Sequence, residues 1–306
     1  MFEDDFSGRS TRTEVIERGE PGYPRRLELL GDPPERIFVR GSIPDGTMVA
    51  IVGARDADPA GCRFAHRLAR ELVEAGVSVV SGGAAGIDSA SHKGALEAGG
   101  STVAVLGAGF DHPYPKSNVG LFEQLERSGA LVSEFEPGVP PSRWTFPRRN
   151  RIVAALASAV VVVQASARSG ALITAKEARK IGVPVGAVPA SPADARGRGC
   201  NSLIRGKAAM IEGVSDVANM LSGSGAVEQL HLPTMKSQGK ETPSKALGSL
   251  SDEEAAVFER LSATPVHIDD IAALAELTAA QAASALMSLE LAGLAEDLGG
   301  KVFVKV

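Results

Sequence analysis

The chain is poor in cysteine, in aromatic residues and in long apolar runs. Its two cysteines, Cys62 and Cys200, lie far apart without a CxxC spacing, which argues against a disulfide framework or a zinc site and favours a reducing cytoplasm. No apolar run reaches the ~18 residues of a transmembrane helix, and the acidic, polar residues 1–10 do not resemble a signal peptide. Aromatic residues make up only 4%, so base stacking would rest on one or two rings. We therefore expect a cytoplasmic protein without a membrane partner.

The net charge of −5 is unevenly distributed along the 306 residues. Residues 250–306 hold ten Asp and Glu against three Lys and Arg, a net of −7, so the rest of the chain carries +2. Basic side chains gather at residues 143–151, with four arginines, and at residues 196–207, with three arginines and a lysine. This asymmetry indicates a polyanionic partner for the larger, basic part of the chain only.

Short apolar runs alternate with segments of helical spacing between residues 47 and 188. Strands bounded by glycine and proline turns, separated by helices, predict a parallel sheet with helices on both faces, a doubly wound α/β fold. The strands are expected at residues 47–53, 77–81, 102–106, 131–133, 159–163 and 185–188, with helices at 60–75, 87–98 and 121–127 and from residues 146 and 170.

Composition divides the chain into four segments. Residues 1–20 are polar and charged and are expected to form a loose N-terminal arm. Residues 21–221 form the α/β domain. Residues 222–249, rich in Ser, Gly, Lys and Gln, are typical of a flexible linker. Residues 250–306 predict three helices and a hairpin, the pattern of a winged-helix domain.

Residues that suit phosphate follow four of the expected strands. Glycines let the backbone approach a ligand, arginine and lysine supply charge, and the N–H groups of a helix N-terminus attract anions. Each of these turns could also be an ordinary capping or solvated turn. The candidates are Gly53, Arg55, Gly82, Gly86, Lys116, Asn118, Ser169 and Gly170.

The strongest local signal is a group of arginines at residues 146–151, where a helix is expected to begin. Two of these arginines lie three residues apart on one helix face, and the third is turned away by about 100°. Like charges on one turn repel unless an anion neutralises them, and Glu134 and Glu136 are possible internal partners. We favour contact with phosphate. The expected contacts are Arg148, Arg149, Arg151 and the hydrogen-bonding Asn150.

No catalytic site can be assembled from the sequence. It contains neither GxSxG nor HExxH, and Cys62 has no catalytic context. Asp88 and His92 lie four residues apart but lack a third metal ligand, so a capping Asp and a core or surface His are favoured. We therefore predict binding rather than turnover, with no catalytic residue, metal or cofactor.

Taken in order, eight motifs resemble the DNA-processing protein A family (DprA/Smf). The resemblance spans residues 23–221, and the predicted winged helix also suits that family. The motifs are GAR (53–55), SGGAAGIDSASHKGAL (81–96), AVLGAGFDHPYPKSN (104–118), SEF (133–135), FPRRNR (146–151), SGALITA (169–175), VPVGAVP (183–189) and GCNSLI (199–204).

The resemblance implies an extended Rossmann-like fold and a role without catalysis. Members of the family bind and protect single-stranded DNA, form dimers, and load a RecA-type recombinase onto DNA that enters by natural transformation. Carried over by motif, Arg55, Lys116, Asn118 and residues 148–151 would contact phosphates. Residues 169–170 would seat a further phosphate at a helix N-terminus.

The sequence departs from the family pattern in three places. Ala85 stands where many members have an arginine before Gly-Ile-Asp, so one cationic contact is absent. Pro189 is followed by Ala190 and not by the usual glycine. The N-terminal helical domain of longer members is missing or cut back to residues 1–20.

The acidic C-terminal domain is expected to bind protein rather than duplex DNA. Its third expected helix, residues 279–292, contains no Lys or Arg, although a winged helix normally reads DNA through this element. We expect this domain to contact a protein partner or a second copy of the chain.

Two other functions remain open at this stage. The first is a nucleotide-hydrolysing enzyme similar to the phosphoribohydrolases, whose PGGxGTxxE motif is matched here only by the TxxE ending at residues 174–177. The second is a nucleotide-sensing adaptor whose α/β pocket binds a small nucleotide while the winged helix docks a partner.

Overall fold

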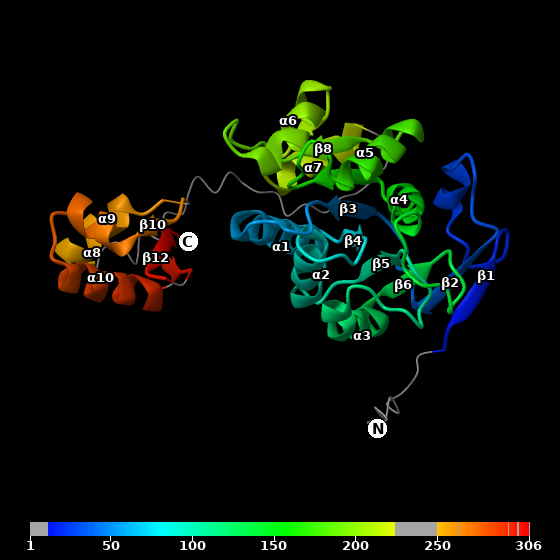
Figure 1. The fold of residues 1–306 in the computed structure, drawn as a ribbon, viewed down its shortest axis with the longest axis horizontal. Coiled ribbons are helices and arrows are strands. Elements are labelled where there is room, and N and C mark those ends of the chain that lie inside the picture. The colour runs from blue at the N-terminus through cyan, green and yellow to red at the C-terminus, as the bar shows by residue number, and fades with distance from the viewer. Residues whose placement is uncertain (1–11, 224–249, 263, 293, 299, 306) are drawn as a thin grey trace. The chain divides into compact units, whose positions relative to one another are not determined.

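The computed structural model describes residues 12–223, 250–262, 264–292, 294–298 and 300–305 (Figure 1). The chain divides into two compact units, residues 1–234 and 235–306. We call the described part of the first the α/β unit and that of the second the winged-helix unit, and consider each by itself.

A mostly parallel sheet forms the centre of the α/β unit. Among the described residues its order is β1-β2-β6-β5-β4-β3-β7-β8-β9, and all neighbours from β6 to β9 are parallel. At the other edge β2 runs antiparallel to β6 and β1 antiparallel to β2. The strands are β1 (Glu14–Glu17), β2 (Arg36–Gly41), β3 (Met48–Val52), β4 (Ser78–Ser81), β5 (Thr102–Leu106), β6 (Ala130–Ser133), β7 (Ala159–Val162), β8 (Val185–Ala187) and β9 (Ala209–Met210).

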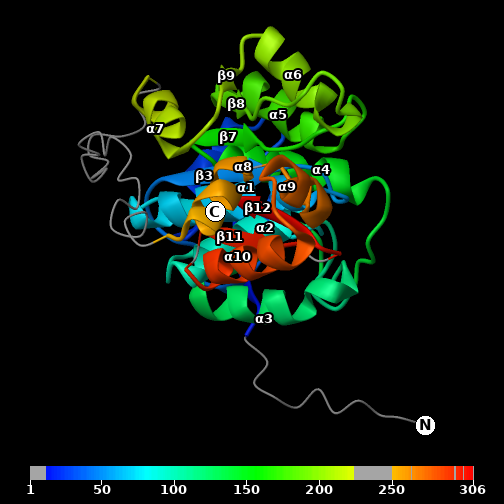
Figure 2. The ribbon, with the colours of Figure 1, turned by 90° about the vertical axis from the view of Figure 1, so that its left-hand side faces the viewer.

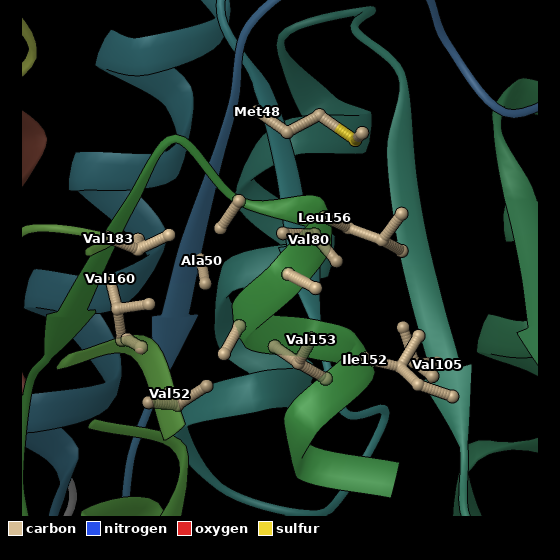
Figure 3. Packing of buried hydrophobic residues seen from close by; sticks show 14 of the residues in the cluster. Met48, Ala50, Val52, Val80, Val105, Ile152, Val153, Leu156, Val160 and Val183 are labelled. Carbon is tan, nitrogen blue, oxygen red and sulfur yellow. The ribbon is translucent and has the colours of Figure 1, made fainter. Parts of the chain in front are cut away.

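Helices cover both faces of this sheet, which explains why its central strands are buried at every position and are almost entirely apolar. On one face α4 packs Ile152 and Leu156 against β3, β5 and β7 (Figure 3). On the other face α1 and α7 pack against the alternate residues of β3 and β7. The predicted doubly wound α/β fold is confirmed. The helices are α1 (Pro59–Glu74), α2 (Ile87–Glu97), α3 (Val119–Ser128), α4 (Thr145–Leu156), α5 (Ala171–Lys180), α6 (Arg198–Arg205) and α7 (Val214–Gly223).

Two helices lie at opposite sides of the α/β unit. In Figure 1 α3 lies near β6 and α6 lies near β8, and Figure 2 also shows α3 and α6 far apart. Three 3-10 turns connect the elements: η1 (Arg25–Leu29), η2 (Lys116–Asn118) and η3 (Ala195–Gly197).

The N-terminal segment differs from the expected loose arm. Residues 1–11 lie outside the described residues, but β1 pairs in register with β2, from Glu14 opposite Val39 to Glu17 opposite Arg36. Ile16 is buried in the main core, whereas Val15 is exposed. A single buried side chain in a charged stretch gives little periodic signal, which is why the sequence did not reveal the strand.

The first two residues of the expected linker belong to a helix. Ser222 and Gly223 form the end of α7, and residues 224–249 lie outside the described residues.

The winged-helix unit contains the three helices and the hairpin that the sequence predicted, and a third strand, not predicted, pairs antiparallel with the hairpin. Capping boxes begin its first and third helices, at Ser251 with Glu254 and at Thr278 with Gln281, and satisfy N–H groups at each helix start. The third helix packs Leu286 into the core of the unit. The elements are α8 (Asp252–Arg260), β10 (Val266–His267), α9 (Ile268–Leu274), α10 (Ala279–Leu291), β11 (Ala295–Asp297) and β12 (Val302–Lys305).

Among the described residues, no single helix has the length and apolar composition needed to cross a membrane. The helices α9 and α10 meet those criteria only as a pair, and the pair is bent by 107°.

Close packing of α1 on α2 leads to a prediction about stability. A Cβ added to Gly94 would lie 2.1 Å from the carbonyl oxygen of His66, so we expect Gly94→Ala to lower the unfolding free energy by about 1–3 kcal/mol. Gly120 in α3 has open space around it, so Gly120→Ala is the matched control and should be neutral or stabilising by up to about 1 kcal/mol. Urea denaturation of both variants checks this, and equal midpoints would contradict it.

Candidate functional site

The candidate site lies where the chain changes direction across the sheet. From β3 the chain proceeds through β4, β5 and β6 on one side, and β7 then joins β3 on its other side. The carboxyl ends of parallel strands splay apart at such a switch point, and ligands bind there in α/β folds. A pocket of about 340 Å³ occupies this position, lined by the ends of β3 and β4 and by the starts of α4 and α5.

Glycines at the strand ends allow neighbouring loops to approach one another. A Cβ on Gly53 would lie 2.5 Å from the Ile87 side chain, and a Cβ on Gly82 would lie 2.5 Å from the Arg149 guanidinium. Gly86 has a φ of +77°, and its Cβ would meet the Ala54 carbonyl at 2.3 Å. Gly53 and Gly82 line the pocket, whereas Gly86 begins α2 outside that lining. Their first role is therefore close packing within the fold.

Of the residues selected from the sequence, Arg55 has the guanidinium group that is most accessible to a ligand in the pocket. Its side chain is exposed and lines the pocket, and its guanidinium carbon lies 4.7 Å from the centre of the Phe146 ring. Stacking on an aromatic face orients a guanidinium while leaving its N–H donors free for a phosphate. Phe146, which the sequence analysis did not select, also lines the pocket.

The Arg149 side chain points inward from α4. Only 5% of it is exposed, and its Nη1 donates to the carbonyl oxygens of Gly82 and Val105. Burial lowers the pKa of Arg149 to about 10, against the opposing effect of Asp88. The expected direct contact with phosphate is thus replaced by a structural one, because this guanidinium joins α4 to β4 and β5.

Arg148 and Arg151 share one carboxylate. Oε1 of Glu134 accepts from Arg148 Nη2 at 2.7 Å and from Arg151 Nη2, and the side chain of Glu134 is only 7% exposed. This is the internal neutralisation that the sequence left open. Arg148 stays half-exposed, at 48%, while Arg151 is nearly covered, at 12%. Arg148 is therefore the member of the pair that remains accessible to a ligand.

Asn150 and the start of α5 meet in the pocket. The Nδ2 of Asn150 donates to the Gly170 carbonyl at 3.3 Å, and Ser169 Oγ accepts from the Ala171 N–H at 3.3 Å. All four residues line the pocket. The first residues of α5 therefore face this space, and their role as a phosphate seat stays a prediction.

Lys116 and Asn118 lie outside the pocket lining. Asn118 is buried, and its Nδ2 donates to the Gly83 carbonyl at 2.9 Å and to Ser89 Oγ at 2.8 Å. Its amide thus ties the loop before α3 to the turn after β4 and is not presented to a ligand. Lys116 is exposed on η2 and keeps its charge in solvent.

Arg196 is a pocket residue that the sequence candidates omitted. It is half-exposed, lines the pocket, and pairs with Asp58 at 3.6 Å and Asp194 at 3.4 Å. The basic stretch 196–207 was the available signal, but nothing in the sequence showed that η3 would face the turn after β3.

Asp88 and His92 are structural, as the sequence favoured. The N–H of Ala84 donates to Asp88 Oδ2 at 3.3 Å, and burial raises the pKa of Asp88 against the opposing effect of Arg149. His92 Nδ1 lies 2.8 Å from Thr102 Oγ1, which itself donates to the Val79 carbonyl. The Thr102 hydroxyl must therefore accept from His92, which leaves the buried Nε2 without a partner.

The buried imidazole predicts a dependence of stability on pH. Burial, assisted by Arg149, lowers the pKa of His92 to about 3, so below pH ~6.5 the unfolded chain binds a proton that the folded chain does not. Relative to a His92→Asn variant, we expect the wild-type unfolding free energy to fall by about 1.4 kcal/mol per pH unit between pH 6 and 4. Denaturant titrations across this range test it, and parallel curves would contradict it.

Each of the two units of the chain matches a known family model. Residues 14–222 match the family model of DNA recombination-mediator protein A, and residues 241–301 match the DprA winged helix domain. A protein of Mycobacterium tuberculosis named for DNA processing (DprA) is 41% identical over 253 residues, which is 82% of this chain and 63% of that protein. The chain thus spans less than two thirds of that relative. Protein Smf of Synechocystis is 33% identical over 92% of this chain and 77% of its own length.

Solved structures of the same kind share the fold. DNA processing protein A from Streptococcus pneumoniae is 35% identical with a TM-score of 0.64, over 68% of this chain and 74% of that one. The protein from Helicobacter pylori, whose structure is described for its single-stranded DNA binding mode, is 29% identical with a TM-score of 0.61, over 69% of this chain and 96% of that one. The chain belongs to the DNA recombination-mediator protein A (DprA/Smf) family.

Proposed function

We propose that the α/β unit binds single-stranded DNA along the carboxyl ends of its strands, without catalysis. The observation that carries this proposal is the pocket at the switch point, where Arg55, Arg196 and the N-terminus of α5 converge. A polyanion fits these groups, and the Helicobacter pylori relative is described for binding single-stranded DNA.

The accessible charges favour a DNA backbone over a small nucleotide. Arg148 and Lys116 are exposed outside the pocket lining, so cationic groups continue beyond a space of about 340 Å³. A phosphate chain can contact groups both inside and outside the pocket, whereas a mononucleotide is confined to one of these places. This arrangement supports an extended ligand that crosses the start of α4.

The geometry does not support the phosphoribohydrolase alternative at residues 174–177, the TxxE ending that matched its motif. Thr174 is buried in the pocket wall, but Glu177 does not line the pocket and pairs with Lys180 at 2.8 Å. A catalytic carboxylate would need to reach the ligand. No described observation favours the nucleotide-sensing adaptor over DNA binding.

We further propose that the protein loads a RecA-type recombinase onto the bound strand, acts in transformation and recombination in the cytoplasm, and forms a homodimer. The winged-helix unit is proposed to bind a protein, because α10 carries no Lys or Arg and the unit is acidic. Duplex DNA would meet repulsion from this unit.

Arg55→Ala tests the DNA-binding proposal. We expect the affinity for a labelled oligo-dT to fall about tenfold in low salt, because a charge-assisted contact with phosphate is lost. The slope of log affinity against log salt should become shallower by about 0.7, the value for one phosphate contact on a single strand. Fluorescence anisotropy at several salt concentrations measures both quantities.

The matched control for Arg55→Ala is Arg70→Ala, an exposed arginine on α1 that pairs with Glu74 and lies outside the pocket lining. It should change neither affinity nor slope. Binding by the wild type that is weak and independent of salt, or equal effects of the two variants, would contradict the proposal.

Recombinase loading is tested on single-stranded DNA coated with a single-strand-binding protein. We expect the wild type to shorten the lag before recombinase filaments form, because bound protein would place the recombinase on the strand. Arg55→Ala should shorten it less. Filament growth is followed with labelled recombinase. If the lag stays unchanged when the protein saturates the DNA, recombinase loading is refuted.

A further inference from the structure

Trp144 is an exposed aromatic residue in a protein that buries or half-buries nearly all the others. It is the only tryptophan in the chain, and 60% of it is accessible to solvent. Among the described residues, Tyr114 is the one other exposed aromatic side chain. The exposed part of this ring makes no packing contribution to the fold and is free to contact a ligand.

The ring of Trp144 is held in place without being covered. Phe135 contacts it edge-on, with ring centres 5.6 Å apart and planes inclined by 81°. The backbone of Trp144 forms the N-cap of α4, and its carbonyl accepts from the Arg148 N–H at 3.4 Å. One side of the ring is thus anchored on the fold, and much of its surface stays open.

Basic residues stand on either side of Trp144 in the sequence. Arg143 precedes it and is exposed, and Arg148 follows four residues later on the same helix face, also exposed. The nearby carboxylates are already occupied, since Glu134 holds Arg148 and Glu136 lies 3.9 Å from Arg36. An exposed aromatic ring in a stretch with two exposed arginines suits a single strand, in which bases alternate with phosphates.

The position of Trp144 also matches the proposed path of the strand. Phe146, two residues along α4, lines the pocket and carries Arg55 on its ring. Trp144 itself lies outside the pocket lining, at the N-cap of α4, so a strand that leaves the pocket over the start of this helix can reach it. Paired bases in a duplex could not turn a face toward this ring, whereas an unpaired base can.

We propose that Trp144 is a stacking platform for an unpaired base of single-stranded DNA, just outside the pocket. The inference rests on the proposed function and adds a contact that discriminates unpaired bases from bare backbone. Phosphates are attracted by the neighbouring arginines, and the ring takes the base between them.

Intrinsic fluorescence reports this contact directly, because Trp144 is the sole tryptophan. Adding oligo-dT to the full chain should quench its emission with the same midpoint as binding measured by anisotropy. An abasic oligomer of equal length, which keeps the phosphates and lacks the bases, should bind more weakly and leave the emission nearly unchanged.

Substitution provides the second arm of the test. Trp144→Ala should lower the affinity for oligo-dT about tenfold, within the range for one stacked base, and leave the affinity for the abasic oligomer unchanged. Trp144→Phe should recover most of the affinity. Met210→Ala changes an exposed apolar residue on the edge strand β9, outside the pocket lining; it is the matched control and should bind as the wild type does.

The outcomes separate this inference from the function on which it rests. Salt-dependent binding of oligo-dT without quenching overturns the role of Trp144 and leaves the DNA-binding proposal intact. An equal loss of affinity for oligo-dT and abasic oligomer in Trp144→Ala also overturns it, since the ring would then act through the fold. Failure of the wild type to bind oligo-dT refutes both proposals.

Discussion

The buried guanidinium of Arg149 is the constraint on which the site depends. Removing a cation from water costs several kcal/mol, which is offset here by the carbonyls of Gly82 and Val105 and by the nearby carboxyl of Asp88. These bonds fix the start of α4 to the ends of β4 and β5. At the other end of α4, Arg26 donates to the carbonyls of Ala155 and Ala157. Everything that α4 presents to the pocket takes its position from these two attachments.

Neighbouring arginines on α4 have different roles because a helix turns each side chain in a different direction. Arg149 points into the fold, Arg151 is nearly covered beside Glu134, and Arg148 shares that carboxylate while remaining half-exposed. Counting charges in the sequence therefore overestimates the cationic surface. Inside the pocket the exposed guanidinium groups are those of Arg55 and of Arg196, which pairs with Asp58 and Asp194, and they come from loops far apart in the chain. Arg148 and Lys116 are exposed outside the lining.

The acidic and basic parts of the chain fold into different units. This separation supports DNA binding by one unit and protein binding by the other. The α/β unit has the pocket, the exposed arginines and an open aromatic ring. In the winged-helix unit, the helix that normally reads DNA offers no cation. Proposals for DNA and for a protein partner consequently fall on separate parts of the chain.

The sequence by itself determined the alternation of strands and helices, the winged helix, the family, and the turn of about 100° between Arg148 and Arg149, because periodicity and turn residues are local. It also favoured the structural roles of Asp88 and His92. Only tertiary structure could show that Asn118 is buried, that Glu134 neutralises two arginines, and that Arg196 and Phe146 reach the pocket. It also placed β1 at the sheet edge through one buried residue, Ile16. Such facts depend on which distant segments meet, and no spacing along the chain encodes them.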